Sequence, residues 1–146
     1  MLFIEKIMSH EIVFIDEFYF DKKICVKEGY KYRIIGILEK INSSWCIIYD
    51  PEFPSKKFHV NLELCNIETL HCNQLCQFLG ILNVKNDINL NLKDETQNSI
   101  DDALQTCKIY LKATIARNSH SLDLKQLKNA IRLRRQFIEK ESNGKI

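Results

Sequence analysis

The stretch Lys31–Ile41, with the sequence KYRIIGILEKI, constrains the fold more than any other part of the chain. Its β-branched residues favour a strand. Its apolar residues do not alternate, because Ile34 and Ile35 are adjacent. Both faces should therefore be buried, which places the strand in the middle of a sheet or across two sheets. Gly36 lies at its centre and predicts a bulge or sharp bend. A bent, two-faced strand is what a small closed barrel requires.

Four more segments predict the remaining strands of such a barrel. They lie at 45–49, 57–62, 75–84 and 104–116. Alternation in the last of them predicts a core-facing set: Cys107, Ile109, Leu111, Ala113 and Ile115. An apolar lead-in at 12–20 predicts a further short strand that packs on the barrel.

The chain ends in a predicted helix over residues 121–141. Leu124, Leu127 and Ile131 recur at helical spacing, and Ser121 is the predicted N-cap. Leu133 and Phe137 lie off this stripe, which indicates a second apolar face. The helix carries six basic and three acidic residues. Two interpretations follow: a helix that covers the end of its own barrel, or an interface helix that packs on a partner.

Five strands followed by a helix, without alternation of the two, predict an all-β protein with an added helix. The expected architecture is a five-stranded OB-fold barrel plus a C-terminal α-helix. We divide the chain into an N-terminal extension with the lead-in strand (1–22) and the barrel (23–120) with a mobile acidic loop (85–102). The interface helix (121–141) and a tail (142–146) follow.

Composition narrows the function classes. The chain has 146 residues and a net charge of +2, too small to make a polyanion the default partner. No apolar run is long enough to cross a membrane, and the N-terminus lacks the signal-peptide pattern. The six cysteines are best explained as buried thiols in a reducing compartment.

No cofactor or metal site is predicted. The spacing of Cys65, Cys72 and Cys76, with His71 beside them, lacks the close cysteine pair of a zinc knuckle. The four histidines are scattered, and no P-loop, GxSxG or HExxH motif occurs. We therefore expect that the protein is not an enzyme.

The outward strand faces carry the residue types that bind single-stranded nucleic acid. Such sites combine a positive groove with aromatic platforms, and Tyr110 lies between Lys108 and Lys112 on one face. Ordinary solvated strand faces are the alternative, and the small net charge fits weak or shared binding. The candidate nucleic-acid-binding residues are Arg33, Lys57, His59, Lys108, Tyr110, Lys112 and Arg117.

Three segments resemble the smallest subunit of the telomeric CST complex, the Ten subunit. They are Arg33–Leu38, Leu75–Leu82 with its Leu-Gly-x-Leu ending, and Leu127–Phe137 with its Ala-Ile-Arg core. An analogous small OB subunit of an insect telomere-capping complex is equally compatible with the sequence.

The resemblance implies a nuclear, non-catalytic subunit at chromosome ends. It would pair through its C-terminal helix with a larger, Stn-like OB-fold protein, and share binding of single-stranded telomeric DNA. The expected partner-binding residues are Leu124, Leu127, Ala130, Ile131, Arg134, Arg135, Phe137 and Ile138. The alternative is a stand-alone single-stranded nucleic-acid-binding OB module of a complex like replication protein A.

Overall fold

The predicted five-stranded barrel forms, and strand β2 (Lys31–Asn42) closes it. Residues 31–37 pair antiparallel with β5 (Leu75–Val84), and residues 37–42 pair antiparallel with β3 (Trp45–Asp50). The prediction of a central strand with two apolar faces is confirmed, because Ile34 and Ile35 are both buried on opposite faces of β2.

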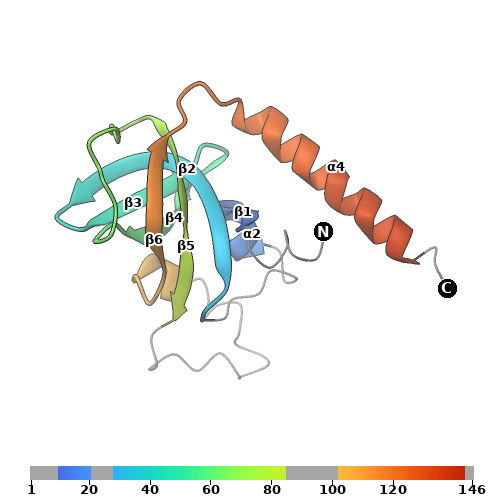
Figure 1. Cartoon of the computed structure of the whole chain (residues 1–146), viewed down its shortest axis with the longest axis horizontal. Coiled ribbons are helices and arrows are strands. Elements are labelled where there is room, and N and C mark those ends of the chain that lie inside the picture. Colours follow the sequence, from blue (N-terminus) through green and yellow to red (C-terminus); the bar gives the residue numbers. More distant parts are fainter. Residues whose placement is uncertain (1–9, 21–27, 85–101, 144–146) are drawn as a thin grey trace.

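The structure, a computed structural model, describes residues 10–20, 28–84 and 102–143. Residues 85–101 of the predicted loop (85–102) and residues 144–146 of the predicted tail (142–146) lie outside these residues, whereas Asp102 begins a helical turn and 142–143 belong to the C-terminal helix. The barrel runs β2-β3-β4-β6-β5 and returns to β2, with β4 and β6 parallel (Figure 1). This is the all-β OB barrel with a C-terminal helix that the sequence predicts. The other elements are β1 (Glu11–Phe14), α2 (Ile15–Phe20), β4 (Phe53–Asn61), β6 (Ile109–Asn118) and α4 (Leu124–Asn143).

The lead-in contributes more to the barrel than one short strand. Strand β1 pairs parallel with residues 32–35 of β2, whereas β3 pairs with residues 37–42. Residues 15–20 form helix α2, so a strand prediction there is wrong. The backbone N–H of Phe14 donates to the Glu17 carboxylate at 2.9 Å, which caps the start of this helix. Phe18 of α2 is buried and stacks on Phe58, with ring centroids 5.0 Å apart.

Gly36 does not mark the bulge of β2. The register shift against β3 lies between Leu38 and Lys40. A Cβ atom on Gly36 would lie 2.7 Å from Ile15 Cδ1 and 3.1 Å from the Tyr49 carbonyl oxygen. Glycine is therefore favoured here by the close approach of α2 and β3 to the strand, next to Ile37, where the pairing of β2 passes from β5 to β3.

The last strand starts and ends later than predicted. Residues 102–105 form a helical turn, and β6 begins at Ile109. A register shift against β5 then places one extra residue on β6, because Leu79 pairs with Ile115 and Gly80 pairs with Ala113. The bulge reverses the alternation. Ile115 is consequently 43% exposed, which corrects its predicted core position.

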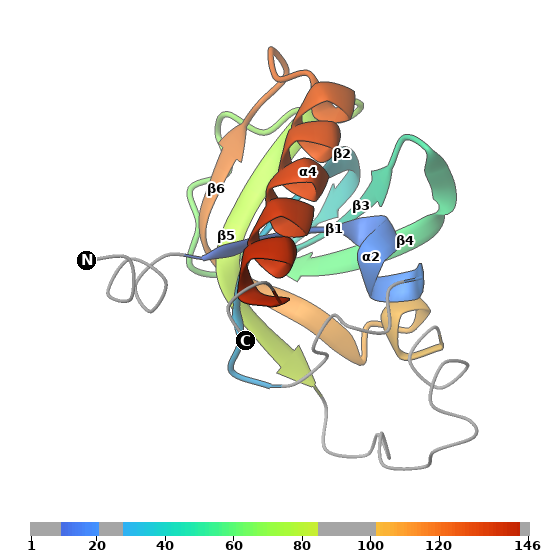
Figure 2. The ribbon, with the colours of Figure 1, turned by 90° about the vertical axis from the view of Figure 1, so that its right-hand side faces the viewer.

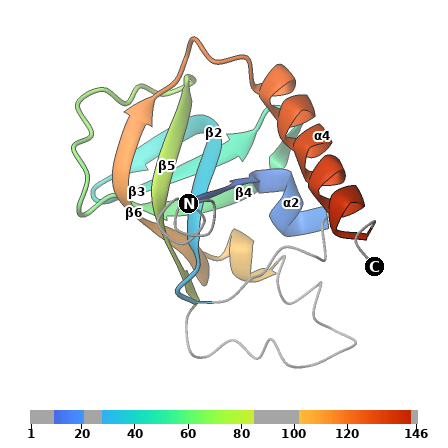
Figure 3. The ribbon, with the colours of Figure 1, turned by 45° about the vertical axis from the view of Figure 1, so that its right-hand side comes forward.

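Helix α4 lies across the outside of the barrel, over β1, β2 and the start of β5, with α2 at its side (Figures 2 and 3). Its first turn is capped by Asp123, whose carboxylate accepts the backbone N–H of Gln126 at 3.1 Å. The predicted cap, Ser121, lies two residues before it. None of the helices in the described part of the chain is long and apolar enough to cross a membrane.

Candidate partner and nucleic-acid interfaces

One row of apolar side chains fixes α4 to its own barrel. Leu124, Leu127 and Ile131 pack against a cluster that Phe14 of β1 and Ile35 of β2 form on the outer surface. Their helical spacing puts them on one face of α4. Three of the residues expected to bind a partner therefore pack against the chain's own barrel instead.

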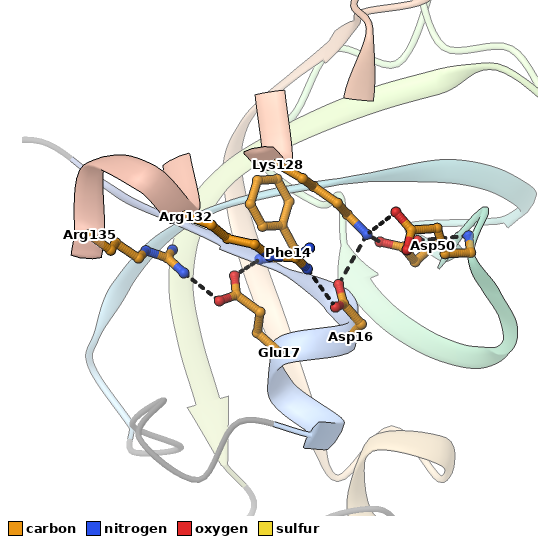
Figure 4. Close-up of polar contacts among 8 residues, drawn as sticks. Phe14, Asp16, Glu17, Asp50, Lys128, Arg132 and Arg135 are labelled. Carbon is orange, nitrogen blue, oxygen red and sulfur yellow. Dashed lines mark hydrogen bonds and ion pairs between the residues drawn. The ribbon is translucent and has the colours of Figure 1, made fainter. Parts of the chain in front are cut away.

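A row of ion pairs runs beside these apolar contacts (Figure 4). The Lys128 ammonium lies 2.5 Å from the Asp50 carboxylate and 3.2 Å from the Asp16 carboxylate. All three residues are buried, and we call them the Lys128 cluster. Arg132 reaches Asp16 at 3.1 Å, and Arg135 pairs with Glu17 and with the Ile12 carbonyl oxygen.

The opposite face of α4 is apolar and uncovered by the described residues. Leu133 is 66% exposed, Phe137 63% and Ile138 50%. Ala130 and Arg134 are exposed as well. We call Leu133 and Phe137 the exposed face of α4; Ile138, seven residues after Ile131, lies in line with the barrel-facing row instead. A surface helix that covers only its own barrel has no need of two large apolar side chains on its solvent side.

The eight expected partner-binding residues thus separate into two groups. Ala130, Arg134, Phe137 and Ile138 are accessible to another molecule. The other four, Leu124, Leu127, Ile131 and Arg135, contact the barrel, α2 or β1. Leu133 joins the accessible group, and its position off the main stripe was the signal for it in the sequence.

Four of the seven candidate nucleic-acid residues meet on the outer face of β4 and β6. His59 of β4 pairs with Tyr110 of β6, and Lys112 lies two positions along. Lys57 is on the same face of β4. Three others lie elsewhere: Arg33 on β2, Lys108 before β6, and Arg117 toward the far end of β6. The Nε atom of Arg33 is buried and has no acceptor among the described residues.

Trp45, which the sequence-based prediction missed, completes this surface. Its ring lies edge-on against Tyr110, with centroids 4.9 Å apart. A cavity of about 460 Å³ opens beside it. The cavity is lined by Lys40, Asn42, Trp45, Cys46, Ile47, His59 and Cys107. The signal was available, since Trp45 is the single tryptophan and begins a strand at an OB barrel's ligand-binding face.

The positive charge of this surface is lower than the sequence suggests. Burial lowers the pKa of His59, only partly opposed by its hydrogen bond to the Leu104 carbonyl, so this side chain is neutral at physiological pH. The Lys57 ammonium lies 2.5 Å from the Glu39 carboxylate, which offsets part of its charge. The arrangement can stack bases on Trp45 and Tyr110, with modest attraction for phosphate.

In the described part of the chain, burial disfavours the thiolate form of Cys46, Cys65 and Cys76. None of the described cysteines, Cys46, Cys65, Cys72, Cys76 and Cys107, forms a disulfide bond. Burial raises the pKa of Cys76 to about 11, which disfavours the thiolate that a metal site needs. Among residues 10–20, 28–84 and 102–143, no group of three or more His, Cys, Asp and Glu side chains could hold a metal ion.

Comparison with known proteins decides the family. The family model described as "Telomere-capping, CST complex subunit" matches residues 7–141. The chain belongs to this telomere-capping family. The match includes β1, α2, the whole barrel and α4 up to residue 141. The resemblance seen in three short segments is confirmed.

Two solved structures share the fold of this family member. One is a chain of the Schizosaccharomyces pombe Stn1–Ten1 complex, with a TM-score of 0.57, 12% identity, and coverage of 88% of this chain and 93% of that chain. The other is the telomere capping protein Ten1 from S. pombe, with the same TM-score and identity, covering 88% and 99%. No curated protein sequence matches the chain.

Proposed function

We propose that this chain is a small, non-catalytic OB-fold subunit of a telomere-protecting complex and pairs with a larger OB-fold partner through the exposed face of α4. The observation that carries the proposal is the exposure of Leu133 and Phe137 on a helix whose other face already covers the barrel. Membership of the telomere-capping family supports the place of action.

The partner is a protein of the Stn type. A similar fold occurs in the S. pombe Stn1–Ten1 complex, which is an assembly of two different chains. An amphipathic helix with a second apolar face is suited to helix-to-helix docking. Arg134 and Lys140 flank the exposed face of α4 and favour a partner helix with acidic residues at its rim.

The complex acts in the nucleus, at chromosome ends. Chromatin immunoprecipitation of the tagged chain should enrich terminal repeat DNA over internal loci. Equal recovery of terminal and internal DNA would reject a telomeric role, whatever partner the chain has.

The outer face of β3, β4 and β6 serves as a shared site for single-stranded telomeric DNA. The Trp45–Tyr110 pair beside the cavity favours this second role. The net charge of +2 fits binding that is shared with other subunits rather than supplied by this chain alone. A stand-alone module of the replication protein A type would instead bind single-stranded DNA as an isolated chain at low salt.

Trp45→Ala should weaken binding of single-stranded telomeric DNA by the complex about 5-fold, because loss of a stacked base costs about 1 kcal/mol or more. Fluorescence anisotropy with a labelled oligonucleotide at low salt measures the change. Phe53→Ala is the matched control, since Phe53 is an exposed aromatic residue outside the cavity lining. Equal affinities of the two variants would reject this surface as the site.

A further inference from the structure

The buried ion pairs between α4 and the barrel demand a more exact helix position than the apolar contacts do. Apolar packing is non-directional, so the row of leucine and isoleucine contacts tolerates a rotation of the helix. The contacts of Lys128 allow a much smaller rotation of the helix, because its ammonium lies 2.5 Å from the Asp50 carboxylate and 3.2 Å from the Asp16 carboxylate. Rotation of the helix would leave two buried carboxylates without their counter-ion, and breaking a buried ion pair is strongly destabilising.

The Lys128 cluster is shielded from solvent, and its outermost neighbour is the half-exposed Glu52 carboxylate, 3.5 Å from the Lys128 ammonium. Lys128 is 1% exposed, and its ammonium also lies 5.6 Å from the centre of the Phe14 ring. Burial alone would lower the pKa of Lys128, but the contacts with Asp50 and Asp16 outweigh it and raise that pKa. Lys128 therefore stays charged, and the cluster acts as a fixed attachment point for α4.

Helix geometry links this attachment point to the exposed face of α4. Each residue turns the helix by about 100°, so Leu133, five positions after Lys128, lies about 140° away from it. Phe137, nine positions after Lys128, lies about 180° away. When Lys128 points into the cluster, both side chains must point away from the barrel, as their exposures of 66% and 63% show.

We propose that Lys128, held by Asp16 and Asp50, is the positioning residue that sets the rotation of α4 on the barrel and so directs Leu133 and Phe137 toward the partner. The inference rests on the proposed pairing through α4. Buried ion pairs contribute little net stability compared with apolar replacements, and their best-attested use is to specify one arrangement among several. The pairs made by Arg132 and Arg135 extend the same row along the helix.

The first test replaces the charge and keeps the chain length with Lys128→Met. The partner recovered per mole of tagged chain in native affinity purification should fall at least 10-fold. Hydrogen–deuterium exchange of the α4 amides should rise in the isolated chain. Lys125→Met is the matched control, because Lys125 is exposed on the same helix. Equal partner recovery for Lys128→Met and Lys125→Met would overturn the proposal.

A neutral triple variant separates positioning from stability. Lys128→Met with Asp16→Asn and Asp50→Asn removes every buried charge from the cluster and leaves only the half-exposed Arg132 and Glu52 without these partners. It therefore keeps the test valid even if Lys128→Met alone fails to fold. We expect the melting temperature to return close to that of the unmodified chain while partner recovery stays low. If both the melting temperature and the partner recovery returned to those of the unmodified chain, Lys128 would act only on stability and the proposal would be overturned.

The outcomes also distinguish this inference from the proposed function. If Leu133→Asp with Phe137→Asp keeps the partner, pairing through α4 is wrong, and the inference falls with it. If that variant loses the partner and Lys128→Met keeps it, pairing through α4 stands and only the positioning role of Lys128 is wrong.

Discussion

Replacing Leu133 and Phe137 together by aspartate should release the partner and leave the barrel folded. Both side chains are mostly exposed, so their removal breaks little packing inside the chain. In the complex they would be buried anchors, and such anchors contribute about 2 kcal/mol or more each. Aspartate would add two desolvated charges to the interface. We expect partner recovery in native affinity purification to fall at least about 100-fold.

The choice of residues in this experiment comes from the structure. Ile131→Asp, which the sequence alone suggests, would disturb the docking of α4, because Ile131 packs on the outer cluster of Phe14 and Ile35. Gln136→Asp is the control, since it adds one aspartate at an exposed position of the same helix. Unchanged recovery for the double variant, or an equal loss for Gln136→Asp, would place the partner on another surface.

Gly80→Ala should destabilise the barrel more than any other single methyl addition at a described glycine. A Cβ atom there would lie 2.2 Å from the Lys112 carbonyl oxygen and 2.7 Å from Ala113 Cα. Both atoms belong to the backbone of β6, at the bulge in the pairing of β5 with β6. Neither can move without breaking the ladder, so we expect a loss of about 3 kcal/mol or more in the free energy of unfolding.

Denaturant unfolding of the isolated chain measures this loss. Gly29→Ala is the matched control, because Gly29 has a φ of 95° but nothing within 4 Å of an added Cβ. Backbone strain alone should cost about 1 kcal/mol at that turn. A smaller loss for Gly80→Ala than for Gly29→Ala would contradict the close strand approach on which the bulge, and the exposure of Ile115, depend.

Local patterns predicted the elements that tertiary contacts do not alter. The bounds of β5 and nearly all of β2 follow from their apolar runs and flanking turns. The prediction from alternation was wrong for the second half of β6, because one extra residue at the bulge changes which side chains face the core. The apolar pattern of the sequence does not show where such a bulge lies. Helix α2 was missed because six residues rich in aromatic side chains read as a strand, and only the Glu17 cap identifies a helix there.

The candidate sites show the same division. The second apolar face of α4 was visible from Leu133 and Phe137, since helical spacing alone defines it. The carboxylates that pair with Lys128 could not be predicted from the sequence, because Asp16 lies 112 residues earlier in the chain and only the fold brings it close. Lys57 and His59 were correctly placed on one strand face, but Glu39 and burial reduce their charge through contacts that the sequence does not display.

The most direct test of the account is native affinity purification of the unmodified tagged chain, with identification of the proteins that it retains by mass spectrometry. We predict that the main co-purifying protein is a larger OB-fold protein, in an amount close to one per tagged chain, and that it is missing from the preparation of the Leu133→Asp, Phe137→Asp variant. Recovery of the chain without such a protein, or with the same protein on the variant, would contradict the account.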